Sequence, residues 1–234
     1  MHYSMKGLVM RWIAVPAFRA ACMVASATTA EAQDYRFAAA YNAGAAYFTP
    51  FNGGASGPDG SLASEISLDA GWIVGLQFEQ WLGSGRTGWR INGALTERPV
   101  ALPGGSRDVG LWFADFDLLL RLFPATPDRR VNAALSLGAG MVRYKLGDGD
   151  PLFFESANAS YAGDDDVRFV GAGGLSVDVL TSWLWDGDPV GIRIEIMDHV
   201  ALDSPFKPIS GSDFDPIHNV RLVIGAFAGW GILR

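Results

Sequence analysis

The strongest pattern in the sequence is an alternation of apolar and polar residues. In segment 65–79 the apolar side chains fall on every even position, and the odd positions carry mainly Gly, Ser, Gln and acidic residues. Segment 219–232 alternates in the same way. A period of two residues is that of a β-strand, whereas an amphipathic helix needs a period of 3.6 residues. Both segments are therefore predicted strands.

Further segments repeat this period and raise the number of predicted strands to eight, an even number. They lie at residues 35–47, 89–96, 112–122, 131–141, 168–185 and 192–196.

Long and short connections alternate between these strands. The long polar stretches lie near 50–63, 97–107, 147–166 and 199–217, and the short ones at 83–86, 124–130 and 186–189. Strands joined this closely pair as antiparallel hairpins, because parallel neighbours need longer crossovers. All long loops then emerge at one end, and closing the sheet removes its exposed edges. The pattern predicts an all-β, eight-stranded antiparallel up-and-down barrel.

The direction of the apolar face separates two kinds of barrel. A lipocalin-like soluble barrel turns it inward, whereas an outer-membrane barrel turns it toward lipid. The polar faces here often carry Gly, Ser or Asn, where a soluble barrel would show Lys, Glu and Thr. The longer strands also exceed the ~9–11 residues needed to cross the hydrocarbon. These features favour a transmembrane barrel with four long extracellular loops and three short periplasmic turns, and the soluble barrel is the alternative.

Charged residues on the polar faces predict an ionic network inside the barrel. All of its cations are arginines, which suit forked pairing with carboxylates in a confined space. An eight-stranded barrel has room only for its own side chains or one small ligand, so we expect a plug of ion pairs and water. The predicted network comprises Glu65, Asp69, Glu79, Arg90, Asp115, Asp117, Arg121, Arg168, Asp178, Arg193, Glu195 and Arg221.

Aromatic residues near the strand ends predict the membrane interfaces, where amphipathic rings gather. They are Tyr35, Trp89, Trp183, Trp185 and Trp230 near the short-turn end, and Tyr47 near the long-loop end.

Composition agrees with a membrane protein that crosses by strands. The chain has 234 residues, 49% of them hydrophobic, and a formal net charge of −7. Its mean hydropathy of +0.16 is high for a soluble domain. No stretch after residue 32 reaches the ~18 apolar residues of a membrane helix. The acidic balance argues against nucleic acid as a partner.

The first 32 residues predict a cleavable signal peptide. Lys6 and Arg11 precede an apolar stretch that ends in the small-residue pattern Ala30-Glu31-Ala32. A retained membrane helix is the alternative, and Pro16 and Arg19 count against it. Residues 33–234 then form the barrel, which lacks cysteine and relies on packing and hydrogen bonds instead of disulfides.

Taken together, the signal, strand count, loop alternation and ionic interior resemble the small eight-stranded outer-membrane barrels of the OmpA transmembrane-domain and OmpX type. The resemblance covers residues 33–234. It implies an integral outer-membrane protein, inserted by the barrel assembly machinery and surrounded by outer-membrane lipid and lipopolysaccharide. We expect a monomer. Members of the group end in an aromatic residue, whereas here Trp230 lies four residues before the end.

Three functions follow from these predictions. The first is a non-catalytic barrel whose loops provide surface contacts or support the envelope. The second is a narrow passive pore for small solutes, for which Gly and Ser on the inner face would leave room. The third is a lipid hydrolase of the lipid A deacylase kind, built on a rim histidine, His199, near Asp198, Asp203 and Ser204. No His-x-Ser spacing is present, so we predict the first function, with no catalytic residue, metal or cofactor.

Overall fold

The computed structural model describes residues 35–56, 62–66, 68–102, 105–123, 130–146, 152–156, 159–163, 165–185, 188–202 and 216–232. In this part of the chain no helix is long and apolar enough to cross a membrane. The predicted signal peptide, residues 1–32, lies outside the described residues.

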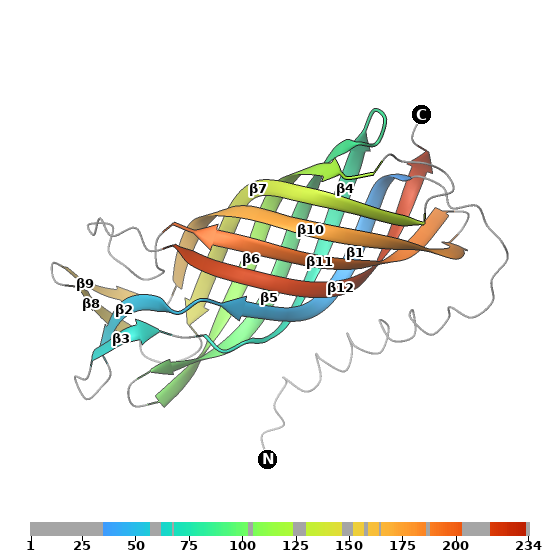
Figure 1. Cartoon of the computed structure of the whole chain (residues 1–234). Helices are drawn as coiled ribbons and strands as arrows, with labels where there is room; N and C mark the ends of the chain where they lie inside the picture. Colours follow the sequence, from blue (N-terminus) through green and yellow to red (C-terminus); the bar gives the residue numbers. More distant parts are fainter. Residues whose placement is uncertain are drawn as a thin grey trace, which may run out of the picture.

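Eight long strands close into a barrel in the order β1-β12-β11-β10-β7-β6-β5-β4 (Figure 1). Every neighbouring pair is antiparallel, and β1 closes the barrel by pairing with both β12 and β4. The eight-stranded antiparallel up-and-down barrel is therefore confirmed. Its strands are β1 (Tyr35–Phe48), β4 (Gly71–Leu82), β5 (Thr87–Leu102), β6 (Gly105–Arg121), β7 (Val131–Leu146), β10 (Asp165–Trp185), β11 (Asp188–Ala201) and β12 (Ile217–Ile232).

Four short strands form a second sheet at one end of the barrel (Figure 1), which we call the loop end. They are β2 (Phe51–Ser56), β3 (Leu62–Ile66), β8 (Leu152–Ser156) and β9 (Ala159–Gly163), in the order β3-β2-β8-β9. β2, β8 and β9 lie in two stretches that the sequence predicted as long loops, and β3 begins in the first of them. We call this sheet the loop sheet, and the opposite end of the barrel the turn end.

The structure corrects two predicted boundaries. The stretch 97–107 is not a loop, because β5 and β6 remain paired as far as Leu102 opposite Gly105. Backbone N–H and C=O groups beyond the apolar part of the wall still need hydrogen-bond partners. The neighbouring strand supplies these partners whatever the side chains are. The strand predicted at 65–79 is divided between β3 of the loop sheet and β4 of the barrel.

The apolar face of the barrel strands points outward. Trp72, Leu137 and Phe169 are 71%, 73% and 81% exposed, and Leu, Ile, Val and Phe residues are exposed on the strands between them. Such a continuous apolar surface excludes water and is matched by lipid. The soluble alternative, with its apolar face inward, therefore does not describe this barrel.

Candidate functional site

The barrel interior contains three layers of buried side chains. An aromatic layer lies toward the turn end, an ionic layer lies in the middle, and an apolar layer lies toward the loop end. The order follows β4, on which Trp81, Glu79, Gln77 and Ile73 point inward in turn from the turn end.

Arg193 on β11 organises one half of the ionic layer. Its Nε and Nη2 donate to the two carboxylate oxygens of Asp178, each at 2.7 Å, and Nη2 also donates to Glu79 at 2.6 Å. Nη1 donates to Oε1 of Gln77 at 2.9 Å. Only 1% of the Arg193 side chain is exposed. One guanidinium thus connects β4, β10 and β11 across the barrel.

Arg90 on β5 organises the other half. Its Nη2 lies 3.1 Å from Asp117, and its Nη1 donates to Glu195 on the far wall. Glu195 also accepts from Arg221 at 3.2 Å and from Nε2 of Gln77 at 2.8 Å. Gln77 therefore donates to one half of the layer and accepts from the other, so the two halves form one network.

His199 extends this network toward the loop end. Its Nε2 lies 2.9 Å from Asp115, and none of its side chain is exposed. Its ring packs 5.2 Å from that of Phe113. Asn92 donates to both Asp115 and Asp117. The sequence predicted His199 at the rim of the barrel, and this is wrong, because His199 lies on the inward face of β11 and its imidazole is buried inside the barrel.

The buried charges balance. Among the described residues, five buried carboxylates face five buried guanidiniums. The carboxylates are Glu79, Asp115, Asp117, Asp178 and Glu195, and the guanidiniums are Arg90, Arg98, Arg121, Arg193 and Arg221. The pattern missed Arg98, which donates to the backbone carbonyls of Glu97 and Trp72. These ten buried side chains together carry no net formal charge.

The aromatic layer closes the turn end. The guanidinium of Arg121 lies 4.0 Å from the ring centre of Trp81, and the hydroxyl of Tyr35 donates to Asp178 at 2.8 Å. Tyr35 was predicted to lie at the membrane interface, and this is wrong, because it is only 1% exposed and points inward. Ala38, three residues later, is also buried, so the alternation breaks at the start of β1. Trp81 was missed because it follows the predicted strand.

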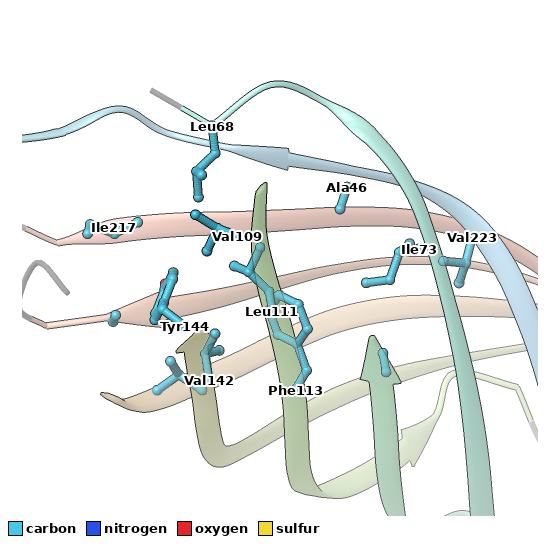
Figure 2. Close-up of a cluster of buried hydrophobic side chains, with 13 residues drawn as sticks. Ala46, Leu68, Ile73, Val109, Leu111, Phe113, Val142, Tyr144, Ile217 and Val223 are labelled. Carbon is cyan, nitrogen blue, oxygen red and sulfur yellow. The ribbon is translucent and has the colours of Figure 1, made fainter. Parts of the chain in front are cut away.

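The apolar layer fills the loop end (Figure 2). It is a hydrophobic core inside the barrel, where the sequence pattern predicted polar residues. Leu68 lies outside the barrel strands and packs onto this core, although the alternation in segment 65–79 predicted that it would point outward. The layer comprises Ala46, Leu68, Ile73, Ala94, Val109, Leu111, Phe113, Val142, Tyr144, Val170, Ala201, Ile217 and Val223. Apolar residues on both faces of segment 109–113 were the available signal.

Besides Arg121 of the aromatic layer, three predicted network residues lie away from the ionic layer. Glu65 is on β3 of the loop sheet, opposite Asn52, and Asp69 is exposed between β3 and β4. Arg168 pairs with Asp166 at 2.8 Å near the loop end of β10. The predicted interior positions of Glu65 and Asp69 are therefore wrong, because the chain enters the barrel wall only at Gly71, where β4 begins.

The other predicted interface aromatics lie in three places. Trp89 and Trp230 belong to a ring cluster on the outer wall, in which Phe78 lies 5.7 Å from Trp89 and 6.0 Å from Trp230. Tyr47 is 52% exposed near the loop end. Trp183 and Trp185 lie in the last part of β10, where its pairing with β11 changes register.

The residues considered for catalysis do not form one site in the described chain. Asp203 and Ser204 lie outside the described residues. Asp198 pairs with His218 instead, and the two side chains lie 2.6 Å apart on the outer wall. No group of three or more His, Cys, Asp or Glu residues suited to a metal ion occurs in the described segments.

A closed eight-stranded meander with an apolar outer wall and a charged interior defines a small outer-membrane barrel. The sequence matches no protein-family model and no curated protein. Its fold is similar to that of the outer membrane protein OprG from Pseudomonas aeruginosa, with a TM-score of 0.53 and 13% identity over 85% of this chain and 97% of that chain. Neisserial surface protein A gives 0.48 and 8% identity over 83% and 97% of the two chains. Ail, the attachment invasion locus protein of Yersinia pestis, gives 0.42 and 12% identity over 82% and 99%. At these identities the likeness shows the fold alone.

Proposed function

We propose that this protein is a closed, non-catalytic outer-membrane anchor that displays the loop sheet for contacts at the cell surface. The structurally similar OprG is an outer membrane protein, which supports the location. The observation that carries the proposal is the buried ionic network, continuous from Arg193 through Gln77 and Glu195 to Arg90.

This layer opposes passage of a solute along the barrel axis. A solute would have to separate ion pairs whose side chains are almost fully buried, such as Arg193 with Glu79 and Arg90 with Asp117. Removing one partner of a buried pair costs ~3–5 kcal/mol. A polar solute from the loop end would also have to cross the apolar layer, and apolar constrictions exclude water and ions. The two layers therefore act in series.

The loop sheet supports a role at the surface. It joins segments about a hundred residues apart in the chain, because Ala55 of β2 pairs with Phe154 of β8. In outer-membrane barrels the longer connections face outward from the cell. A sheet formed from two connections provides a broader and more ordered contact surface than separate loops would.

Conductance of the purified protein in planar bilayers tests the closed barrel. We expect no steady unitary openings in 1 M KCl. Steady openings whose size changes in Asp117→Asn or Arg121→Gln would overturn the proposal in favour of the narrow pore. Arg143→Gln on the outer wall is the matched control, because it removes a charge without touching the interior. A heat-modifiable gel shift of each variant verifies that the barrel is folded.

A further inference from the structure

The half of the ionic layer that Arg90 organises contains more acidic than basic side chains. We call it the Arg90 half, and its charged members are Asp115, Asp117, Glu195, Arg90 and Arg221, all of them buried. The interior toward the turn end is balanced by itself, with Arg121 and Arg193 against Glu79 and Asp178. The remaining buried guanidinium, that of Arg98, lies eight residues from Arg90 on β5, ~26 Å away. With its three carboxyl groups ionised, the Arg90 half would therefore carry one uncompensated negative charge.

The contacts in this half leave two carboxyl groups short of partners. Glu195 accepts from both guanidiniums, Asp117 accepts only from that of Arg90, and Asp115 accepts from neither. Every printed bond of Asp117 ends on Oδ2, which lies 3.1 Å from Nη2 of Arg90 and 2.7 Å from Nδ2 of Asn92. Its Oδ1 is buried and has no hydrogen-bond partner in the described part of the chain. A buried carboxylate without such partners is costly, and taking up a proton removes the cost.

Asp115 and Asp117 lie close together because one amide group joins them. Nδ2 of Asn92 donates to Oδ1 of Asp115 and to Oδ2 of Asp117. The backbone of β7 closes the site on one side. A Cβ added at Gly138 would lie 2.4 Å from Oδ1 of Asp117, and one added at Gly140 would lie 2.6 Å from Cβ of Asp115. Two carboxylates held in one site repel each other, so such pairs retain one proton between them.

His199 is the other group beside this pair that can carry a proton. Its Nε2 lies 2.9 Å from Oδ2 of Asp115, and its Nδ1 is buried without a partner among the described residues. An imidazolium would leave a buried N–H at Nδ1 unpaired, whereas the neutral ring satisfies its one N–H by donating to Asp115. The other charged side chains that face the pair are Arg90 of β5, Glu195 of β11 and Arg221 of β12. The carboxyl pair is therefore the better site for the proton.

We propose that Asp115 and Asp117 form a buried proton-binding site, which takes up one proton at a pH where free carboxyl groups are ionised. The proton brings the Arg90 half to zero formal charge and leaves His199 neutral. The folded protein then binds one proton more than the unfolded chain, so its stability rises as the pH falls toward that of free carboxyl groups. The site makes the closure of the barrel stronger in mild acid.

Infrared spectroscopy of the full protein in phosphatidylcholine bilayers tests the proposal through the C=O stretch of a protonated carboxyl group. Between about pH 8 and about pH 5.5 most free carboxyl groups stay ionised. The wild type should gain a band of one carboxyl group in this range, in sodium and in potassium chloride alike. Asp115→Asn and Asp117→Asn should each lack it. Asp178→Asn is the matched control and should keep it, because both oxygens of this buried carboxylate accept from Arg193.

Urea unfolding of the same proteins measures the effect on stability. Over the range in which only the folded state holds the proton, the unfolding equilibrium constant of the wild type should rise about tenfold for each pH unit. Asp117→Asn should lose this dependence and Asp178→Asn should keep it; Asp115→Asn serves if Asp117→Asn does not fold. The absence of a carboxyl band in the wild type would overturn the proposal, as would a band that persists in both single variants. A protonated His199 ring in nitrogen NMR spectra, or equal pH dependence in the wild type and Asp117→Asn, would overturn it too.

Discussion

Replacing Arg193 by Met tests whether the ionic layer is a dry, ordered structure. The change removes the guanidinium that donates to Asp178, Glu79 and Gln77, while keeping an unbranched side chain of similar length. Two buried carboxylates then lose their main counter-charge. We expect the free energy of unfolding to fall by ~3–5 kcal/mol.

The magnitude depends on the medium inside the barrel. Two unit charges 4 Å apart attract by ~1 kcal/mol in bulk water and by ~4 kcal/mol at an effective dielectric constant of 20. The exposed pair of Arg143 with Asp165 provides an internal standard, because its side chains are 49% and 34% exposed. Asp165→Asn should therefore cost ~0–1 kcal/mol.

Urea unfolding in thin phosphatidylcholine bilayers, followed by tryptophan emission and gel mobility, measures both changes. The triple variant Arg193→Met/Asp178→Asn/Glu79→Gln leaves no uncompensated carboxylate in this half of the layer, and it should recover most of the lost stability. If Arg193→Met costs no more than Asp165→Asn, the interior is as well hydrated as the outer rim. The reasoning for a closed barrel would then fail.

Three other changes examine the remaining parts of the interior and the wall. Tyr35→Phe removes the hydrogen bond to Asp178 and should lower stability by ~1.5–3 kcal/mol, measured in the same unfolding assay; no loss would contradict the inward position of the hydroxyl. Gly229→Ala would place a Cβ 2.7 Å from Cδ1 of Tyr35 and should cost ~1–3 kcal/mol, whereas Gly93→Ala meets no atom within 4 Å and should be tolerated. Incubation with radiolabelled lipopolysaccharide should release no fatty acid; release that disappears in His218→Ala would identify the Asp198–His218 pair as catalytic.

The alternating pattern was sufficient to predict the barrel, because lipid and interior impose opposite chemistry on successive residues of every strand. Ion pairs between neighbouring strands can also be predicted from the sequence. Asp178 with Arg193 and Arg90 with Asp117 lie at directly opposed positions of antiparallel hairpins.

Contacts across the barrel were not predictable in the same way. Arg90 meets Glu195, and Arg193 meets Glu79, only because closure of the sheet brings β4 and β5 opposite β11. The apolar layer was missed for a different reason. At the loop end Leu111 and Phe113 point into the barrel although Trp112, the outward residue between them, is apolar as well, so the alternation is weakest there. Glu65 and Asp69 followed the period of β4 but lie beyond the point where the chain joins the barrel.

The ionic network also has a consequence for how the protein reaches its final state. Its lumen-crossing bonds join residues 84 to 143 positions apart in the sequence, from His199 with Asp115 to Tyr35 with Asp178. Contacts between such distant residues form late, since the chain between them must first be ordered. An open, partly assembled sheet would leave those charges without partners beside hydrocarbon. The seam between β1 and its neighbours and the interior network should therefore form in one cooperative step.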